Sequence, residues 1–525
     1  MAILLFPGRH LLTTRFQERY LADLLRTGEI REVVFAITSA NQANSRYNPL
    51  PLEVRAVGVD RFARDVCAPA AVRWRIVPVP HYGPTARFAD FLLKEIREGT
   101  DGELTLAPAV MKQFEDLGFG VLTAELEARE PPRYCAPTPI EVLKRAVAAD
   151  DPLKDAEVAA EISAATASMW RDFPDVLRRV VRLYRDPLLT EQGSLTEMRN
   201  YSTYAAGMGD RAILELKYQD IRQAIRPGRI ADEGCADGAL LVPIARDFPD
   251  SDLIGIEITG EFMARCRERQ RALEYGGTYI HFHQRNITEA IFSPDSIDTT
   301  ICNSTTHELW SYGSKAETVR AYLREKFRQT RRGGRIIIRD VVGPDDRLDE
   351  VLLWCNPADG ENKRAAPDMK GPTLQKALEA QSTAARFETF CAWYLADQVA
   401  SGHRTPSEML QPRRERIDHR DYFVLPLHHA MEFLLKKDYT DNWRSEMNEE
   451  FCFWSFEDWK RELRNAGFNI IERSETPAAG SRAYCSGWIV KNRFEGKVEL
   501  WRKSGSGLRR LDSPATNMVL VGEKS

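Results

Sequence analysis

Residues 229–238 read Arg-Ile-Ala-Asp-Glu-Gly-Cys-Ala-Asp-Gly, an apolar run that ends in acidic residues and then turns through two glycines. An apolar strand followed by such a turn favours an open sheet whose strand ends face a ligand. Gly234 and Gly238 let the backbone approach that ligand more closely than a Cβ would allow. The next apolar run, 253–256, ends in Glu257, nineteen positions after Gly238, where a carboxylate can accept two hydrogen bonds from a ribose diol. These features predict a site for a ribose-containing ligand on an α/β sheet.

Around this turn, short apolar runs alternate with helical patterns through most of the second half of the chain. Such alternation indicates parallel strands covered by helices on both faces. The predicted strands are 229–232, 253–256, 279–283, 297–302, 335–340 and 468–473, and the predicted helices are 188–224, 240–247, 262–275, 315–329 and 456–466. The alternation stops over 343–450, which we predict to be a largely helical insertion that covers the active site, with helices at 373–399 and 427–437.

The first half shows the same alternation and predicts a second sheet of this kind. Residues 139–185 have a helical pattern that breaks at Pro174. The predicted strands of this half are 3–6, 32–37, 74–79 and a short one near Leu104, and the predicted helices are 14–26, 52–65 and 87–98. We therefore predict an α/β protein of two doubly wound, Rossmann-like parallel-sheet domains, at 1–185 and 186–525, with the insertion in the second.

Composition excludes several classes of protein. The 525 residues carry 73 Lys and Arg against 77 Asp and Glu, a net charge of −4, and 43% of them are hydrophobic. These values are typical of a globular chain and do not favour a general polyanion binder. No apolar run approaches the roughly 20 residues of a membrane span. The start, MAILLFPGRH, has neither the basic region nor the cleavage site of a signal peptide.

Cysteine and histidine spacing gives no sign of a metal or disulfide framework. The nine cysteines are scattered and are never spaced as Cys-x-x-Cys, so a disulfide framework or a structural zinc site is not indicated. The close histidine pairs, His281/His283 and His428/His429, are more typical of strand or surface positions than of a ligand set. We therefore expect a cytoplasmic protein with no metal site.

Residues 232–238 resemble motif I of class I S-adenosylmethionine-dependent methyltransferases, Asp-x-Gly-x-Gly-x-Gly, with Ala236 in place of the middle glycine. Three further segments match the family in order. Residues 298–307 resemble motif IV, the strand that faces the methyl group, 331–340 resemble the later glycine turn and strand, and 456–468 resemble the last helix and turn.

The resemblance covers about residues 188–525 and implies S-adenosyl-L-methionine as the cofactor. Glu257 takes the place of the ribose-binding acid, and Asn286 takes the place of the residue that contacts the adenine ring. The cofactor-binding residues implied by the resemblance are Asp232, Gly234, Ala236, Gly238, Glu257, Asn286 and Asn303.

Three residues are candidates for catalysis. His307 and Glu308 follow the motif IV strand in Asn-Ser-Thr-Thr-His-Glu-Leu-Trp, residues 303–310, where a pair of this kind can act as a base or as a clamp on the acceptor. The alternative is a loop-capping pair with no chemical role. Asp340, at the end of another strand, is a second candidate acid, and its alternative role is to cap the next loop.

Residues 6–17, Phe-Pro-Gly-Arg-His-Leu-Leu-Thr-Thr-Arg-Phe-Gln, resemble the first-strand loop of nucleotidyltransferases of the archaeal nicotinamide-mononucleotide adenylyltransferase type, Gly-Arg-Phe-Gln-Pro-Phe-His-x-Gly-His. Thr14 falls on the first histidine of that motif, where related families also use threonine. Gln17 falls on the second histidine, which normally donates to the nucleotide phosphates, so the chain departs from the family there. His10 replaces that histidine only if the loop shifts.

Other segments of the first half match the same family in order. In the segment 134–141, Glu141 replaces the arginine that meets the triphosphate in the family. The matching segments are 37–55, 106–108, 117–119, 134–141 and 173–176. The resemblance implies a nucleoside triphosphate with Mg²⁺, and the nucleotide-binding residues that it implies are Gly8, Arg9, Thr14, Gln17, Ser39, Asn48, Arg55 and Thr138.

The two resemblances lead to three hypotheses. The first is a bifunctional cytoplasmic enzyme that transfers a methyl group to a small-molecule acceptor and a nucleotidyl group in the same pathway. The second is a methyltransferase whose first domain binds a nucleotide or substrate without catalysis. The third is a nucleic-acid-modifying methyltransferase, which the basic runs 331–332 and 413–416 keep open as an alternative. The sequence identifies neither the acceptor, nor the oligomeric state, nor the pathway.

Overall fold

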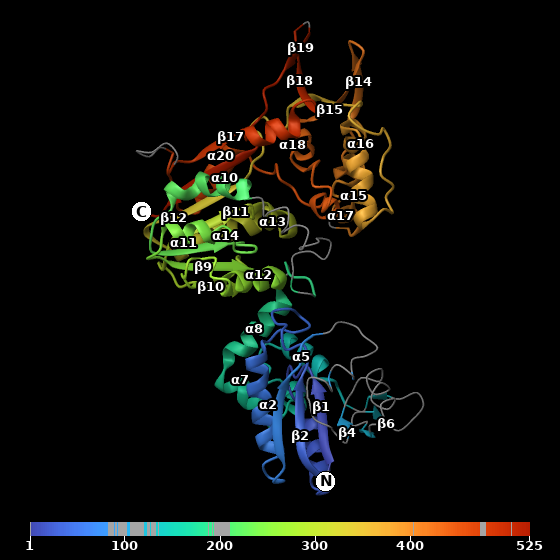
Figure 1. Cartoon of the computed structure of the whole chain (residues 1–525), viewed down its shortest axis with the longest axis vertical. Coiled ribbons are helices and arrows are strands. Elements are labelled where there is room, and N and C mark those ends of the chain that lie inside the picture. The colour runs from blue at the N-terminus through green and yellow to red at the C-terminus, as the bar shows by residue number, and fades with distance from the viewer. Residues whose placement is uncertain are drawn as a thin grey trace. The chain divides into compact units, whose positions relative to one another are not determined.

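The computed structural model describes residues 2–81, 89, 92, 102–104, 120–122, 126–127, 133–134, 136–186, 188–191, 193, 211–402, 404–472, 479–505 and 507–525. It divides into two compact units, Met1–Ser194 and Leu195–Ser525 (Figure 1). Each unit is described by itself. Among the described residues, no helix combines the length and the apolar character that crossing a bilayer requires.

A five-stranded parallel sheet forms the centre of the first unit, in the order β3-β2-β1-β4-β5. Its strands are β1 (Ala2–Gly8), β2 (Ile30–Ile37), β3 (Arg73–Pro78), β4 (Gly102–Leu104) and β5 (Gly120–Leu122). The strand order reverses between β1 and β4, which is where open sheets bind ligands. A separate antiparallel pair joins β6 (Leu126–Glu127) to β7 (Arg133–Tyr134). The strands predicted near the start of the chain are confirmed.

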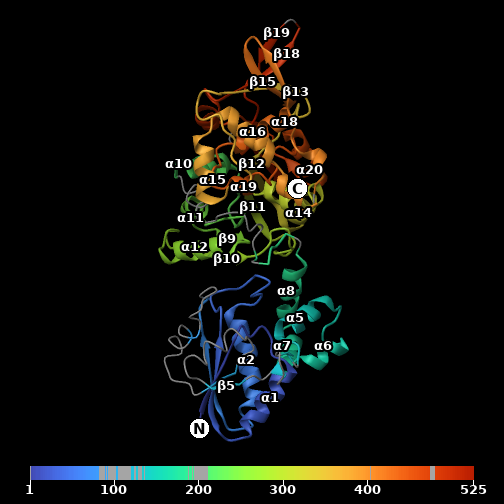
Figure 2. The same ribbon diagram turned by 90° about the vertical axis from the view of Figure 1, so that its right-hand side faces the viewer.

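The helices that are described over their full length in the first unit gather on one side of its sheet (Figure 2), whereas Ala89 and Leu92 pack against Leu5 and Val34 on the other face. They are α1 (Arg15–Leu25), α2 (Leu52–Val66), α5 (Pro139–Ala148), α6 (Ala156–Glu161), α7 (Ala164–Asp172) and α8 (Pro174–Arg185). Pro174 is the first residue of α8, because a proline at the first helical position loses no hydrogen bond. The predicted helix 87–98 and the family-like segments 106–108 and 117–119 lie outside the described residues, apart from single positions.

An eight-stranded sheet forms the first core of the second unit (Figure 1). Its path is β10-β9-β8-β11-β12-β20-β16, and β17 pairs with β20. The strands are β8 (Arg229–Glu233), β9 (Asp252–Glu257), β10 (Ile280–Gln284), β11 (Ile297–Asn303), β12 (Thr330–Val341), β16 (Asn469–Ile470), β17 (Arg482–Tyr484) and β20 (Asn517–Glu523). Strands β8 to β12 are parallel, whereas β20 runs antiparallel to β12. The predicted doubly wound α/β class is confirmed, and the order reverses between β8 and β11.

Helices cover both faces of this sheet. Ile337 on β12 packs in one core cluster with α10, α11 and α12, whereas its neighbour Ile336 lies beside Gly522, against Leu463 of α20. Because successive strand residues point to opposite faces, α20 covers the second face. The helices of this layer are α10 (Arg211–Ile221), α11 (Leu241–Asp247), α12 (Gly260–Arg271), α13 (Thr306–Tyr312), α14 (Ala316–Gln329) and α20 (Phe456–Asn465). Of the helical lead-in predicted at 188–224, the structure describes α10 and one short 3₁₀ turn (Arg222–Ala224).

A second core in the same unit adds strands to the helices predicted for 343–450. That segment holds helices, but it also holds three strands of a five-stranded antiparallel sheet, in the order β14-β15-β13-β18-β19 (Figure 2). The elements are β13 (Glu350–Cys355), β14 (Arg413–Ile417), β15 (Arg420–Pro426), β18 (Val498–Ser504), β19 (Gly507–Arg510), α15 (Gly371–Ala380), α16 (Thr383–Trp393), α17 (Ala396–Ala400), α18 (Leu427–Lys436) and α19 (Trp443–Glu446). The expectation of a largely helical insertion did not include these three strands, because short apolar runs such as 351–355 have no periodicity that separates a strand from a buried helix.

Candidate functional site

The glycine turn after β8 rests on the end of β9. The amides of Gly234 and Cys235 donate to the Ile256 carbonyl at 2.8 and 3.0 Å. Gly234 and Gly238 both have φ of +76°, a left-handed conformation that favours glycine. A Cβ on Gly234 would lie 2.4 Å from Thr305 Oγ1, and one on Gly238 would lie 2.5 Å from the Tyr275 hydroxyl. The turn therefore needs both glycines where the sequence predicted a close approach.

Glu257 joins this turn to the loop after β9. Its Oε2 accepts from the Ala236 amide at 3.0 Å, and its Oε1 accepts from the Ile258 and Thr259 amides at 2.8 Å each. Burial raises the pKa of this carboxyl, the Thr259 amide opposes that rise, and the charge of Glu308 adds to it. Glu257 therefore lies at the strand end predicted for the ribose-binding acid, close to the Glu308 side chain.

Two buried acceptors at the strand-order reversal have no hydrogen-bond partner among the described residues. They are Asp232 Oδ2 on β8 and Asn303 Oδ1 on β11. Burial, followed by the charges of Glu233 and Glu257, raises the pKa of Asp232 to about 7, and Lys217 opposes that rise. A buried acceptor without a donor is costly, so these positions suit a ligand that donates hydrogen bonds.

Asn286, the predicted adenine contact, lies in the loop after β10. Its Oδ1 accepts from the Thr288 amide at 3.0 Å and from the Thr288 hydroxyl at 2.9 Å. The side chain is 5% exposed. These bonds hold the loop in a turn, and a contact with an adenine ring stays a prediction.

Asp340 organises the start of α13. Its Oδ2 accepts from the Thr305 and Thr306 amides at 3.1 and 2.8 Å and from the Thr306 hydroxyl at 2.6 Å. Its Oδ1 lies 2.8 Å from His307 Nδ1 and accepts from the Val341 amide. Burial opposes ionisation of Asp340, but the charge of His307 and these donors outweigh it and lower the pKa to about 2. Asp340 is thus a positioning residue in this geometry, which corresponds to the capping role that the sequence left as the alternative.

His307 lies in a cluster with two glutamates. Its Nε2 is 3.6 Å from Glu449 Oε2, with 7% of the His307 side chain and none of the Glu449 side chain exposed. His307, Glu308 and Glu449 each contribute one nitrogen or oxygen atom that could bind a metal, and these three atoms all lie within 4.8 Å of one another. Burial would lower the pKa of His307, but the charges of Asp340 and Glu449 outweigh that effect and raise it to about 9.

Glu449 was missed by the sequence analysis. It follows α19 at the end of the segment 343–450, far along the chain from His307. Tyr312 donates to Glu449 Oε1 at 2.8 Å, and Lys436 binds the Glu449 carbonyl. The sequence offered no more than the acidic pair Glu449-Glu450 directly before Phe-Cys-Phe-Trp, which is a weak signal because acidic residues are almost never fully buried unless they are paired.

The same segment packs along α13 beside a cavity. The Trp310 and Phe453 rings stack with centroids 4.3 Å apart, and Trp310 Nε1 donates to Glu450 at 3.1 Å. Trp310 and Phe453 line a cavity, within which the centre of a water molecule can occupy a volume of about 600 Å³. Tyr394 and His429 line its second-core side. Because Trp310 follows His307 by three residues, the two side chains lie on neighbouring positions of one helix face.

A fully buried ion pair lies beneath the site. Lys326 of α14 donates to Glu233 Oε1 at 2.7 Å, and both side chains have no exposed surface. The Tyr322 hydroxyl donates to Glu233 Oε2 at 2.8 Å. Burial raises the pKa of Glu233, while Lys326 and Tyr322 oppose that rise. This pair connects α14 to the end of β8, directly before Gly234.

In the first unit, four of the predicted nucleotide-binding residues form helix caps or engage the backbone. Thr14 and Gln17 form a capping box at the start of α1, and Thr138 forms one with Glu141 at the start of α5. The Glu141 pKa is lowered by the Thr138 amide and hydroxyl. Arg55, which is 1% exposed, donates to the carbonyls of Arg9, Thr38 and Ser39 at 2.8–3.1 Å. In this conformation these groups serve the fold, whereas the family resemblance implied that they bind a nucleotide.

The other predicted residues of the first unit lie around the ends of β1 and β2. Ser39 Oγ is 3.1 Å from His81 Nδ1, and Asn48 Nδ2 donates to Gln42 at 2.9 Å. Arg9 is exposed, donates to the Tyr47 carbonyl at 3.0 Å and follows Gly8 at the end of β1.

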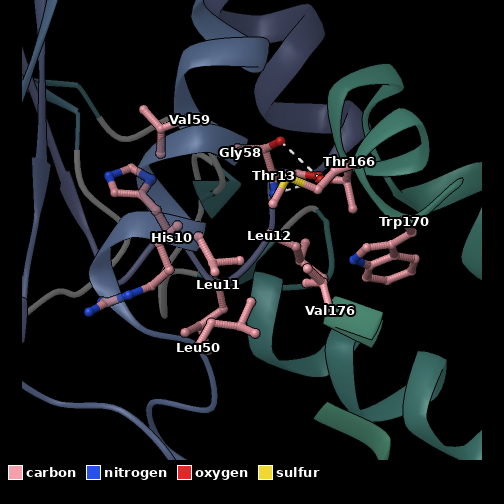
Figure 3. A pocket seen from close by; sticks show the side chains of 13 residues that line it. His10, Leu11, Leu12, Thr13, Leu50, Gly58, Val59, Thr166, Trp170 and Val176 are labelled. Atoms are coloured by element: carbon pink, nitrogen blue, oxygen red, sulfur yellow. Dashed lines mark hydrogen bonds between the residues drawn. The ribbon is translucent and has the colours of Figure 1, made fainter. Parts of the chain in front are cut away.

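Figure 3 shows a cavity in this unit lined by His10, Leu11, Thr13, Thr166 and Trp170. Only about 20 Å³ of it is open to the centre of a water molecule, which is room for about one water. It is too small for a nucleotide.

His10 predicts a pH dependence of the first unit's stability. Burial lowers the His10 pKa from 6.5 to about 4, against the hydrogen bond to the Phe6 carbonyl. Because the folded pKa is depressed, protonation favours the unfolded chain, so the contribution is complete above pH 6.5 and is lost as the pH falls toward 4. We expect the free energy of unfolding to fall by about 2 kcal/mol from this group by pH 5. Urea unfolding at pH 7 and pH 5, followed by hydrogen-exchange mass spectrometry on peptides from β1 and β2, measures this change in the free energy of unfolding.

The variant His10→Asn provides the comparison. Asn tolerates the φ of +49° at this position and carries no charge at either pH. The difference between the two pH values should shrink by about the same 2 kcal/mol, and an unchanged difference would contradict the assignment.

Residues 227–389 match the family model described as a methyltransferase domain. The matched segment contains the glycine turn, Glu257, His307 and Asp340. This segment of the chain therefore matches a methyltransferase domain, and the predicted enzyme class is confirmed at this level. The family match does not extend into the first unit. No curated protein matches the chain.

Among solved structures, the chain is similar to several methyltransferases. One is an S-adenosylmethionine-dependent methyltransferase from Thermotoga maritima, described as a possible histamine N-methyltransferase, with 12% identity, coverage of 62% of this chain and 97% of that one, and a TM-score of 0.28. Another is geranyl diphosphate C-methyltransferase from Streptomyces coelicolor, with 11% identity, coverage of 65% and 86%, and a TM-score of 0.28. A third is a putative methyltransferase from Listeria monocytogenes, with 10% identity, coverage of 60% and 100%, and a TM-score of 0.29.

Proposed function

We propose that the second unit transfers a methyl group from S-adenosylmethionine to a small-molecule acceptor. The observation that carries the proposal is a pair of buried acceptors, Asp232 Oδ2 and Asn303 Oδ1, beside the glycine turn at the strand-order reversal, for which the described part of the chain provides no donor. S-adenosylmethionine offers an ammonium group, a ribose diol and a methyl group on a sulfonium. Asp232 accepts from the ammonium group, and Glu257 accepts from the diol.

The acceptor side is formed by α13 and the segment that crosses it. Glu308 lies close enough to influence the Glu257 pKa and shares a cluster with His307, so this part of α13 adjoins the cofactor region. The acceptor occupies the cavity of about 600 Å³ between Trp310 and His429, a volume typical of small-molecule sites. Holding the acceptor in line with the methyl group supplies most of the rate in such a transfer.

The charge distribution favours a small molecule over a nucleic acid. Arg413 pairs with Glu350, Arg414 with Glu388 and Arg331 with Asp298. Arginines that are paired in this way attract phosphates less than unpaired ones do. Weak RNA binding without a steep salt dependence is therefore expected.

Replacing Glu257 by alanine tests the cofactor site. Loss of charge-assisted hydrogen bonds to the ribose should weaken S-adenosylmethionine binding by about 1–3 kcal/mol, that is by about 5- to 150-fold. Calorimetry on the full-length chain measures this. The matched control is Glu261→Ala, which removes a carboxylate of the following helix that pairs with Arg265. Absence of binding by the unmodified protein would overturn the proposed function.

A second candidate function concerns the first unit, for which we keep nucleotidyl transfer in the same pathway as a proposal. It is supported by the strand order β3-β2-β1-β4-β5 and by the exposed Arg9 after β1. The local bonds of Gln17, Arg55 and Thr138 favour the alternative, a nucleotide- or substrate-binding unit without catalysis. Pyrophosphate release by the full-length chain with Mg²⁺ and ATP or CTP, over a panel of phosphorylated acceptors, decides between them. Release that Arg9→Ala abolishes supports transfer, and no release with any acceptor supports binding alone.

A further inference from the structure

We propose that His307, Glu308 and Glu449 bind one divalent metal ion of the Mn²⁺ or Zn²⁺ type. The ligand atoms come from α13 and from the segment after α19, and they lie within 4.8 Å of one another. The proposal goes beyond methyl transfer and does not depend on the acceptor.

The separation between His307 Nε2 and Glu449 Oε2 suits two ligands of one ion. It measures 3.6 Å, which exceeds the usual 2.7–3.2 Å of an N–H···O hydrogen bond. Two ligands that are each about 2.1 Å from an ion lie roughly 3.0–3.6 Å apart for angles of about 90–120°. The geometry therefore leaves room for an ion where a direct hydrogen bond does not form.

Outer partners already orient two of the three ligands. Asp340 lies 2.8 Å from His307 Nδ1, so Nε2 is the nitrogen that faces the cluster. A carboxylate on the second ring nitrogen is typical of metal-bound histidine. Tyr312 donates to Glu449 Oε1 at 2.8 Å, which directs Oε2 toward His307.

The second core holds Glu449 in place. Glu432 of α18 accepts from the Phe451 and Cys452 amides at 2.8 and 2.7 Å, and it pairs with Lys436 at 2.6 Å. Lys436 also binds the Glu449 carbonyl. Since these residues are buried, the backbone that carries the ligand is fixed before an ion arrives, which a metal site requires.

Charge and donor type point to the same class of ion. Three carboxylates, those of Asp340, Glu308 and Glu449, surround the single imidazole of His307, and Asp340 and Glu449 are at most 1% exposed. A dication is attracted to these carboxylates, beside Lys217, whose charge also interacts with Asp340. One imidazole nitrogen with two carboxylate oxygens suits Mn²⁺, Fe²⁺ or Zn²⁺ better than softer metals.

Calorimetric titration of the full-length, chelator-treated protein with MnCl₂ and with ZnCl₂ tests the proposal. We expect one ion per chain and at least 10-fold weaker binding in His307→Gln and Glu449→Gln. Glu450→Gln is the matched control, because Glu450 follows Glu449 directly but its carboxylate binds Trp310 and Arg404 outside the cluster. This variant should leave the metal affinity unchanged. Titration of the same samples with S-adenosylmethionine reports separately on the proposed function.

A second experiment needs no variant and therefore remains decisive if a variant fails to fold. Crystals of the unmodified protein are soaked in MnCl₂, and anomalous diffraction locates the bound ion. An anomalous peak within coordination distance of all three side chains supports the site. A peak elsewhere, no peak at all, or a His307→Gln variant that is folded and binds Mn²⁺ as the unmodified protein does would overturn it.

Discussion

Replacing Lys326 by methionine is expected to destabilise the second unit by about 3–5 kcal/mol, because it leaves the Glu233 carboxylate buried without its cation. Neither side chain has exposed surface, and Nζ lies 2.7 Å from Oε1. Urea titration followed by hydrogen-exchange mass spectrometry on peptides from β8 and α14 gives the unfolding midpoint of this region. The exposed Lys503→Met, whose side chain is 59% accessible beside Glu415, should change stability by less than about 1 kcal/mol.

The double variant Glu233→Gln with Lys326→Met separates charge from packing. Glutamine removes the buried charge and keeps an oxygen that can accept from the Tyr322 hydroxyl. We expect it to recover at least half of the stability that the single change loses. If the double variant is as unstable as Lys326→Met, lost packing of the lysine side chain, and not the unpaired charge, is the cause.

Replacing Gly234 by alanine is expected to damage both stability and cofactor binding. A non-glycine residue in the left-handed region costs about 1–2 kcal/mol, and the new Cβ would lie 2.4 Å from Thr305 Oγ1, an overlap that costs about 1–3 kcal/mol more. The unfolding free energy should therefore fall by about 2–5 kcal/mol. Since the turn moves, S-adenosylmethionine should bind at least about 10-fold more weakly, a change of about 1.4 kcal/mol.

Gly333→Ala is the matched control for this change. Gly333 has φ of +75°, and a Cβ there meets nothing within 4 Å. It should show the conformational cost of about 1–2 kcal/mol alone, with unchanged cofactor affinity. Equal effects at the two glycines would refute a role for the contact with Thr305.

Local sequence signals predicted the strands and the turn that carry the proposed cofactor half of the site. The apolar run, the glycine turn and Glu257 all lie within the 29 residues 229–257. Their arrangement requires only that two strands that are adjacent in the sequence, β8 and β9, pair with each other. Asp232 and Asn303 were placed on the correct strand ends because parallel strands end at one edge of a sheet.

The acceptor half depends on contacts between distant parts of the chain. Glu449 reaches His307 only because α18 and the second core fix its segment, and no spacing rule connects the two residues. In the first unit, family resemblance implied that Thr138 binds a nucleotide, although Thr138-Pro-Ile-Glu141 is also the pattern of a capping box. The capping box accounts for the hydrogen bonds from Thr138 to Glu141. The family resemblance alone did not distinguish helix capping from nucleotide binding.

The anchoring of Glu449 by Glu432 and Lys436 has a consequence for how substrate selectivity can diversify. In the site that we propose, the glycine turn after β8 holds the cofactor, whereas the second core carries part of the wall of the acceptor cavity. Substitutions in the second core can therefore reshape the acceptor pocket without touching a residue that recognises the methyl donor. A lineage of such proteins can change acceptors while keeping one donor, and selection experiments for a new acceptor should accumulate changes around α18 and 449–453 before any in the glycine turn.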